Sequence, residues 1–322
     1  MYKKFFNLSR NPFEISPDPY FLFATARHNE ALASIVHGVL RHKGFIVVSG
    51  EVGTGKTLLV RCLLELLRRF DIASANVFNP CLSPLEFLRY VVGDLGLKTT
   101  SQDKGSLLLE LNSYLIARHK TNTTTVLIVD EAQHLEPELL EEIRLLTNLE
   151  TSQQKLLQIV LVGQPELDQK MDSPDLRQLK QRIAMRCQLE PLQESETKQY
   201  ILRRLQRAGA KSQANTMFPD ESIAAVYRYS KGIPRLINTV CENALIAAFA
   251  GKSQVVRTEV IDEVAKDLRL NVLTHRPIAA NSVTERQRAV AQSLLGLVEA
   301  LEQIARPTDV REAPTDQGVK IV

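Results

Sequence analysis

The sequence has few of the features that mark exported, membrane-spanning or metal-stabilised proteins. Tryptophan is absent, and the four cysteines are too far apart to form a CxxC pair or a Cys/His cluster with zinc-site spacing. Polar residues interrupt the N-terminal segment before it reaches the length of a signal-peptide core, and no window approaches the ~18 uncharged apolar residues of a membrane span. We therefore expect a cytoplasmic chain with no membrane span of its own.

Positive and negative charges are nearly balanced in the sequence. The 40 Lys+Arg against 37 Asp+Glu leave a formal net charge of +3, which does not by itself predict nucleic acid as a partner. With 44% hydrophobic residues, 14 Gly and 14 Pro, the composition excludes collagen-like and largely disordered chains. A chain of 322 residues is long for one domain, so we expect two packed units.

Aromatic residues are concentrated at the N-terminus. Seven of the 18 lie in the first 23 positions, interleaved with Pro12, Pro17 and Pro19. The prolines favour a non-helical arm, whose aromatic side chains must pack on another part of the protein. We assign residues 1–27 to this arm.

Short apolar segments alternate with helical patterns from residue 28 to residue 192. The apolar segments are rich in β-branched residues and suited to burial on both faces, as in a parallel sheet covered by helices. They lie at residues 45–49, 74–78, 125–130 and 157–163, with helical patterns between them at 58–70, 84–96, 105–120 and 137–150. Repeated βαβ units of this kind predict an α/β domain with a parallel sheet.

Strand patterns stop after Leu189. Helical patterns then follow at 195–209, 219–230, 234–251 and 258–268, which predict an all-helical domain over residues 193–270. Residues 271–322 form a tail with one more amphipathic helix, at about 282–305, whose apolar side chains recur in the pattern of a coiled-coil seam. Such a helix should pack on its own helical domain, on a neighbouring protomer or on a partner.

A phosphate-binding pattern lies directly after the first strand. Residues 50–57, GEVGTGKT, match GxxxxGK[ST] between a predicted strand and a predicted helix. Glycines allow backbone N–H groups to surround phosphates, Lys56 can reach the β- and γ-phosphates of ATP, and the Thr57 hydroxyl can ligate Mg²⁺. The predicted nucleotide-binding loop consists of Gly50, Glu51, Val52, Gly53, Thr54, Gly55, Lys56 and Thr57.

Two carboxylates follow the strand at 125–129. Asp130 lies at the carboxyl end of this strand, where ligands of open α/β sheets bind, and can hold Mg²⁺ as a Walker B aspartate does. Glu131 is placed to polarise the water that attacks the γ-phosphate. The alternative is that the pair merely caps the following helix.

The motifs, in their order, resemble the AAA+ ATPases, and in particular the ExeA/GspA family of general secretion pathway ATPases with their MSHA- and exosortase-associated relatives. The segments that carry the resemblance are the aromatic opening at 1–23, HNEAL at 28–32, GEVGTGKT at 50–57, DEAQHL at 130–135, VGQPEL at 162–167, LKQRIAMRCQLEPL at 179–192 and GIPRLIN at 232–238. The resemblance implies a five-stranded sheet of order 5-1-4-3-2, a helical lid and ATP-driven work on a partner assembly.

The resemblance also assigns roles to single residues. Gln164 matches the sensor 1 position, between the γ-phosphate and the attacking water, and Arg235 matches the sensor 2 position at the start of a lid helix. His28 corresponds to a position close to the adenine, although a lone histidine before a helix is more often only capped and solvated. Asn79 could hold Glu131 inactive until a partner binds, or could simply form a turn.

An arginine finger is expected just before the last strand. Arg182 and Arg186 lie four residues apart, which we interpret as one helical turn, where AAA+ proteins keep the arginine that enters the neighbouring subunit's site. We favour Arg186. A solvated basic helix face is the alternative for both.

The sequence thus predicts an AAA+ ATP hydrolase with ATP and Mg²⁺ as cofactors, assembled as a homo-oligomer. Its partner would be a membrane-associated secretion, pilus or polysaccharide-export complex, which would place the chain in the cytoplasm or peripherally at the inner membrane. One alternative is a DNA-associated ATPase resembling transposition regulators or initiators. Another, a P-loop small-molecule kinase, lacks a recognisable acceptor site.

Overall fold

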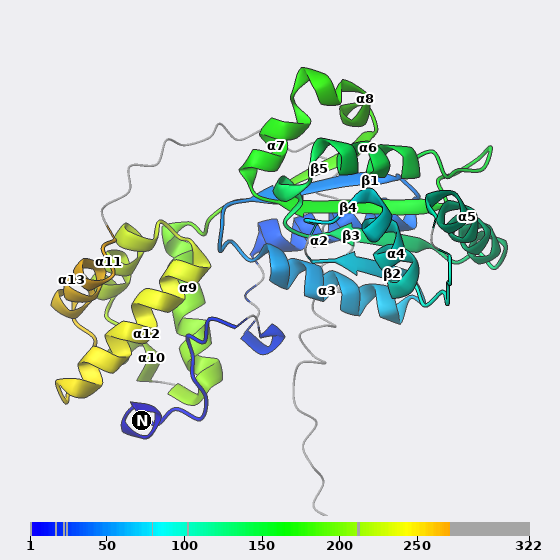
Figure 1. Cartoon of the computed structure of the whole chain (residues 1–322). Helices are drawn as coiled ribbons and strands as arrows, with labels where there is room; N and C mark the ends of the chain where they lie inside the picture. The colour runs from blue at the N-terminus through cyan, green and yellow to red at the C-terminus, as the bar shows by residue number, and fades with distance from the viewer. Residues whose placement is uncertain are drawn as a thin grey trace, which may run out of the picture.

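The computed structural model of the chain describes residues 2–16, 18–21, 23, 25–78, 80–101, 103–210 and 213–270. Asn79 and the predicted tail helix at about 282–305 lie outside these residues. Two units are visible in Figure 1, a sheet covered by helices and a helical unit beside it, with the N-terminal segment running along the helical unit.

The sheet has five parallel strands in the order β2-β3-β4-β1-β5. The strands are β1 (Phe45–Gly50), β2 (Ala73–Val77), β3 (Thr125–Val129), β4 (Leu157–Gly163) and β5 (Ile183–Leu189). Every residue of β1, β3 and β4 is buried, because helices cover both faces of the sheet. The predicted parallel α/β fold and the implied strand order are confirmed.

The helices divide between the two faces. Helices α2 (Ala26–Leu40) and α3 (Lys56–Arg69) share one core with the side chains of Ile46, Ile128 and Val160. The opposite core joins the alternate side chains of the same strands to α4 (Pro84–Asp94), α5 (Lys104–Lys120), α6 (Pro137–Leu146) and α7 (Pro165–Met171). Successive side chains of a strand point to opposite faces, so each central strand contributes to both cores.

Strand β5 corrects the sequence interpretation of the two arginines. Arg186 lies inside the strand and Arg182 directly before it, so they do not share one turn of a helix. The exposure of β5 alternates residue by residue, as expected of an edge strand with one covered face, and Arg186 points away from the core. A spacing of four residues places two side chains on one face of a helix and also on one face of a strand. The pairing with β1 shows that this segment is a strand.

After β5 the described chain is helical. The unit contains α9 (Glu194–Leu205), a π-helical turn at Gln206–Ala210, α10 (Ala214–Met217), α11 (Asp220–Ser230), α12 (Pro234–Ala250) and α13 (Thr258–Asp267). A glycine is required where the chain enters this unit. Gly232 has φ +76°, and its carbonyl accepts the Leu192 N–H. A Cβ at Gly232 would lie 1.8 Å from the Leu192 carbonyl oxygen.

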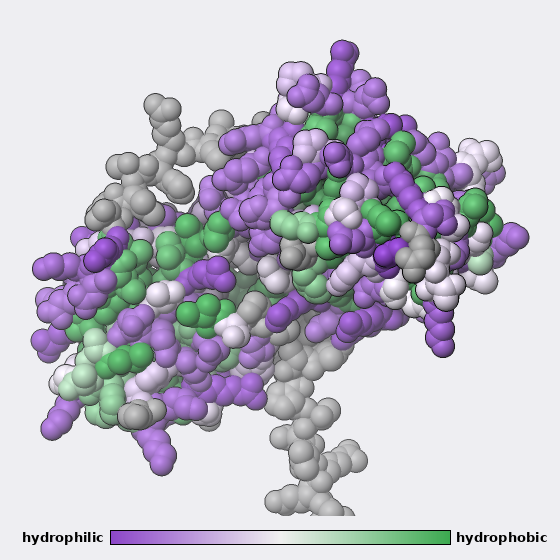
Figure 2. Space-filling model, in the orientation of Figure 1, coloured by the Kyte–Doolittle hydropathy of each residue, from purple (hydrophilic) through white to green (hydrophobic). Residues whose placement is uncertain are grey.

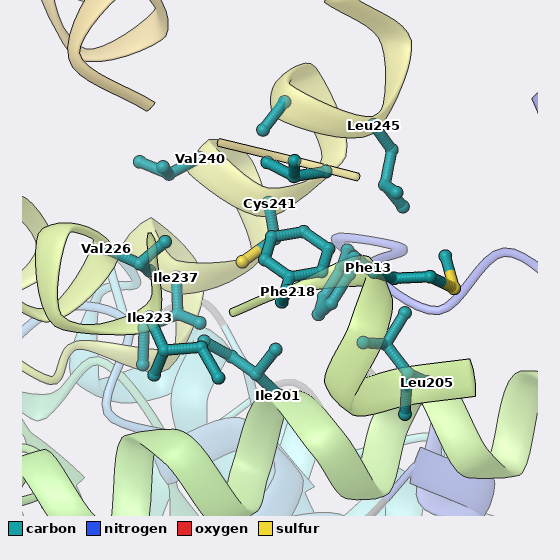
Figure 3. Close-up of a cluster of buried hydrophobic side chains, with 14 of the residues drawn as sticks. Phe13, Ile201, Leu205, Phe218, Ile223, Val226, Ile237, Val240, Cys241 and Leu245 are labelled. Carbon is teal, nitrogen blue, oxygen red and sulfur yellow. The ribbon is translucent and has the colours of Figure 1, made fainter. Parts of the chain in front are cut away.

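The N-terminal arm belongs to the core of the helical unit. Phe6 and Phe13 are fully buried there, and Phe13 lies beside Phe218 and Leu205, as Figure 3 shows. The prediction that the arm must pack on another part of the chain is confirmed. The expectation that it is non-helical is wrong at its start, because residues 2–5 form one helical turn, α1 (Tyr2–Phe5), ahead of the first proline.

A buried arginine joins the arm to α9. Arg204 is 6% exposed, and its guanidinium donates to the carbonyl oxygens of Pro12 (2.5 Å) and Glu14 (3.3 Å) and to the Tyr200 hydroxyl (2.6 Å). The guanidinium carbon also lies 4.8 Å from the centre of the Phe21 ring. Backbone carbonyls of the arm thereby satisfy a charge that would otherwise be costly to bury.

We expect Arg204→Met to lower the free energy of unfolding by ~2–4 kcal/mol, because the arm carbonyls and the Tyr200 hydroxyl lose a charged donor while the aliphatic stem is kept. Urea unfolding measures the loss. Arg228→Met is the matched control: the Arg228 side chain is 52% exposed and 3.7 Å from Asp262, so its loss should be at most ~1 kcal/mol. Equal losses in the two variants would contradict the role given to Arg204.

Candidate nucleotide-binding and catalytic site

The loop between β1 and α3 has the shape of a phosphate cradle. Gly53 and Gly55 have φ of +83° and +104°, conformations that glycine adopts without strain. Gly55 caps α3 and provides no side-chain hydrogen bond, so the first N–H groups of the helix are left for a ligand. Backbone donors and the helix dipole together favour an anion at this place.

Lys56 is held inside this loop. Its Nζ donates to the carbonyl oxygens of Gly50 (2.8 Å) and Glu51 (3.0 Å), and the residue is 7% exposed. Burial lowers the pKa of Lys56, and the nearby carboxylates of Glu131 and Asp130 oppose that shift. The loop carbonyls therefore hold the Lys56 ammonium within the loop.

Asp130 and Thr57 approach each other across the ends of β3 and α3. The Thr57 hydroxyl lies 3.5 Å from Asp130 Oδ2, and Asp130 Oδ1 accepts the Glu131 N–H at 2.9 Å. Burial raises the pKa of Asp130, while the Glu131 N–H and Lys56 act in the opposite direction. The two oxygen ligands that the sequence predicted for Mg²⁺ thus come together.

Glu131, the residue after Asp130, accepts two side-chain hydrogen bonds. Its backbone is left-handed, with φ +52° and ψ +36°, and Oε2 accepts hydrogen bonds from Gln133 Nε2 (2.6 Å) and Gln164 Nε2 (3.4 Å). Burial acts to raise the pKa of Glu131. The hydrogen bonds from these two amides, together with the positive charges nearby, outweigh burial, so the pKa is lowered. Glu131 is therefore a carboxylate at neutral pH.

Gln133 was not among the predicted site residues. The only local signal was its place inside DEAQHL, two residues after Glu131. Its contact with Gln164, 31 residues further along the chain, comes from the adjacent positions of β3 and β4.

A cleft runs between the loop, the helical unit and the arm. Of the predicted site residues, those lining it are Val52, Gly53, Thr54, Gly55, Lys56, Thr57, His28, Glu131, Gln164 and Arg235. The arm contributes Glu14, Ile15, Ser16, Asp18, Phe21 and Phe23, and α9 contributes Tyr200 and Arg204. Gly50, Glu51, Asp130 and Arg186 are not part of this lining. The aromatic arm thus supplies one wall of the cleft, which the sequence reasoning did not foresee.

His28 connects α2 to the phosphate loop. Its Nε2 lies 3.1 Å from the Thr54 carbonyl oxygen, which can only accept, so Nε2 carries the proton. Nδ1 then accepts from the Thr25 hydroxyl at 2.8 Å, and that hydroxyl also caps the helix by accepting the His28 N–H. Burial lowers the pKa of His28, partly offset by the Thr54 carbonyl and by Glu196. The neutral His28 ring therefore connects α2 to the phosphate loop through hydrogen bonds at both of its nitrogens.

Arg235 brings the helical unit against the same loop. Its N–H, in the first turn of α12, donates to the Gly53 carbonyl oxygen at 3.2 Å. A Cβ at Gly53 would lie 2.7 Å from the Arg235 Cβ, so the contact needs glycine at this position. The loop and the start of α12 are therefore in direct contact.

Arg186 and Arg182 lie away from the cleft. Arg186 forms ion pairs with Asp168 (3.3 Å) and Asp172 (3.1 Å) of its own chain, and Arg182 donates to Asn148 Oδ1 at 3.0 Å. In the view of Figure 2, the surface over α7 and α8 (Arg177–Lys180) is mostly hydrophilic. Neither arginine can act on the cleft of its own chain from these positions.

In the part of the chain that the structure describes, none of the helices combines the length and the apolar composition that spanning a membrane requires.

Comparison with protein families and solved structures agrees with this geometry. A family model described as an AAA domain matches residues 39–171. The structure resembles the Aeropyrum pernix ORC2 protein (TM-score 0.58, 17% identity, 80% of this chain and 72% of that one). It also resembles a chain in the structure of Drosophila ORC bound to DNA (TM-score 0.61, 20% identity, 94% and 78%). At these identities the likeness concerns the fold alone.

Two relatives are similar in sequence. General secretion pathway protein A of Aeromonas hydrophila is 44% identical over 262 residues, which are 81% of this chain and 47% of that protein. Mu-like prophage FluMu DNA transposition protein B of Haemophilus influenzae is 30% identical over 160 residues, 47% of this chain and 50% of that protein. The chain thus spans about half the length of these relatives. The resemblance inferred from the motifs is confirmed.

The neutral His28 makes stability depend on pH. Because its pKa in the folded protein is lowered, the unfolded chain binds the proton more readily, and stability falls as pH falls through the ordinary histidine range. His28→Gln keeps a donor for the Thr54 carbonyl but does not titrate. We expect the advantage of the wild-type chain over this variant to shrink by up to ~1.4 kcal/mol per pH unit between about pH 7.5 and 5.5. Urea unfolding across that range measures it, and a constant difference would show that His28 titrates normally.

Proposed function

We propose that this chain, whose fold and motifs are those of AAA+ P-loop proteins and whose sequence is similar to general secretion pathway protein A, binds and hydrolyses Mg-ATP to drive conformational change or assembly of a partner complex. One observation carries the proposal: three sets of polar groups lie together around the loop at 50–57. They are Lys56, the Thr57–Asp130 pair and the Glu131–Gln164 pair. A cation for phosphates, oxygen ligands for a metal ion and a general base are the three components that phosphoryl transfer to water requires.

In the proposed binding step, the phosphates of ATP lie in the loop at 50–57, with Lys56 turned from the loop carbonyls toward the β- and γ-phosphates. Within the described residues, no group of three His, Cys, Asp or Glu side chains could hold a metal ion alone. Thr57 and Asp130 fit Mg²⁺ instead, which usually binds through one or two protein oxygens together with phosphates. A bound Mg²⁺ would neutralise charge developing on the γ-phosphate.

In the proposed hydrolysis step, Glu131 accepts the proton of a water that attacks the γ-phosphate. Its lowered pKa keeps it in the basic form at neutral pH. Gln164 lines the same cleft and donates to Glu131, which suits a group that places the water between carboxylate and phosphate. We further propose that Arg235 responds to nucleotide from the helical unit, with residues 28–192 and 193–270 as the two domains, and that His28 lies close to the adenine.

The division of roles predicts different failures for two variants. Lys56→Ala should abolish ATP binding, because the buried cation is lost from the phosphate site. Glu131→Gln should keep ATP binding and lower turnover by a factor on the order of 10² or more, as expected for the loss of a general base. Nucleotide binding by fluorescence and phosphate release measure the two effects. Normal turnover in Glu131→Gln would reject Glu131 as the base.

We propose that the chain forms a homo-oligomer in which Arg186 completes the site of a neighbouring protomer. Support comes from its place on the edge strand β5, exposed and away from the cleft of its own chain. Its pairs with Asp168 and Asp172 would then be exchanged for phosphate on assembly.

Mixing two inactive variants tests this arrangement. Glu131→Gln and Arg186→Ala proteins together should recover part of the ATPase activity, because some interfaces then join an intact Glu131 to an intact Arg186. Asp172→Asn is the control, since it breaks one of the two ion pairs that Arg186 forms within the chain, leaves the arginine in place, and should stay active. If mixtures shown to co-assemble recover no activity, Arg186 is rejected as the arginine that acts on the neighbouring protomer. It is also rejected if activity recovers only when Arg182→Ala is used in place of Arg186→Ala.

The partner proposed for this ATPase is a membrane-associated secretion, pilus or polysaccharide-export complex, which would hold the chain in the cytoplasm or at the inner membrane. The similarity to general secretion pathway protein A over 81% of this chain supports it. The second candidate is a DNA-associated ATPase, favoured by the likeness to a DNA transposition protein over 47% of the chain. ATPase stimulation by duplex DNA that weakens steeply with salt would identify this second function.

A further inference from the structure

The side chain of Gln133, in the 3₁₀ turn η2 (Ala132–His134), connects the ends of two strands. Its Nε2 donates to Glu131 Oε2 at 2.6 Å, and its Oε1 accepts the Gln164 N–H at 3.0 Å. The orientation of the amide follows from these partners, because a flip would turn Oε1 toward the carboxylate and Nε2 toward an N–H group. Gln133 can therefore present only its N–H to Glu131.

The surrounding chain holds Gln133 in place. Lys170 Nζ donates to the carbonyl oxygens of Gln133 and Leu135, both at 2.8 Å, which fixes the turn from the side of α7. On the other side, a Cβ at Gly163 would lie 2.9 Å from Gln133 Oε1, so the position is open only because residue 163 has no side chain. The amide is thus confined from both sides.

Glu131 needs such support. Its backbone is in the left-handed region, which is strained for a residue other than glycine and persists where the surroundings determine the conformation. The carboxylate of Glu131 lines the cleft together with Gln164, whereas Gln133 does not. Gln133 would therefore affect a bound substrate only through Glu131.

We propose that Gln133 is a positioning residue that holds the Glu131 carboxylate toward the cleft, in the place from which it activates water. The proposal rests on the proposed function, in which Glu131 is the general base. Two side chains donate to Glu131 Oε2, and Gln133 makes the shorter contact, 2.6 Å against 3.4 Å for Gln164 Nε2.

The test replaces the donor by an apolar side chain of similar length, Gln133→Met, in the full chain. The readouts are kcat and KM for ATP hydrolysis at neutral pH. We expect kcat to fall about tenfold while KM for ATP stays within about twofold, because the carboxylate loses its position but the phosphate loop is unchanged. In the Glu131→Gln background, the same change should have no further effect on kcat, since Gln133 acts only through the Glu131 carboxylate.

Two further variants complete the test. Gln153→Met is the matched control, because Gln153 is exposed in the loop before β4, and neither kcat nor KM should change. Gln133→Glu keeps nearly the same shape but replaces the donor by a second carboxylate, which repels Glu131. It should lower kcat at least as far, and it serves if Gln133→Met does not fold.

An unchanged kcat in both Gln133 variants would overturn the proposal, as would an equal loss of kcat when Gln133→Met is added to Glu131→Gln. Failure of the proposed function would appear differently, as normal hydrolysis by Glu131→Gln. In that case Glu131 has no part in catalysis, and the positioning role of Gln133 would be rejected with it.

Discussion

The parallel register of β3, β4 and β1 is the constraint on which the site depends. Ser49 of β1 pairs with Gly163 of β4, and Val129 of β3 pairs with Leu161, so the three strands end at nearly the same level. The phosphate loop, the two carboxylates and Gln164 each follow one of these ends. Because parallel strands bring their carboxyl ends to one edge, groups separated by up to about a hundred residues meet there without any special long-range interaction.

The helical unit completes this edge through contacts of a different kind. It reaches the loop where glycine permits close approach, at Gly53 against Arg235, and it incorporates the N-terminal arm as part of its own core. Arg204 shows how the arm is held: a buried guanidinium is satisfied by arm carbonyls and by Tyr200. The contacts that bury the arm therefore also anchor the aromatic wall of the cleft to the helical unit.

Burial has opposite effects on the charged groups around the loop. It lowers the pKa of Lys56 and raises that of Asp130, and each of the two opposes the shift of the other. Glu131 differs, because hydrogen bonds from Gln133 and Gln164, together with the positive charges nearby, outweigh the effect of burial on its pKa. Neighbouring carboxylates in one site thus have different proton affinities, as distinct roles for a metal ligand and a general base require.

The sequence alone determined the features that are local along the chain. The phosphate loop is a contiguous pattern whose glycines permit backbone conformations that other residues adopt only with strain. The positions of the central strands follow from unbroken runs of β-branched residues. Only the tertiary structure decided the rest. Arg186 lies in a strand because β1 pairs with it, Gln133 meets Gln164 across two strand ends, and the arm enters a core built mostly from residues beyond 190. Periodicity and spacing record local geometry, whereas these contacts depend on which distant segments pack together.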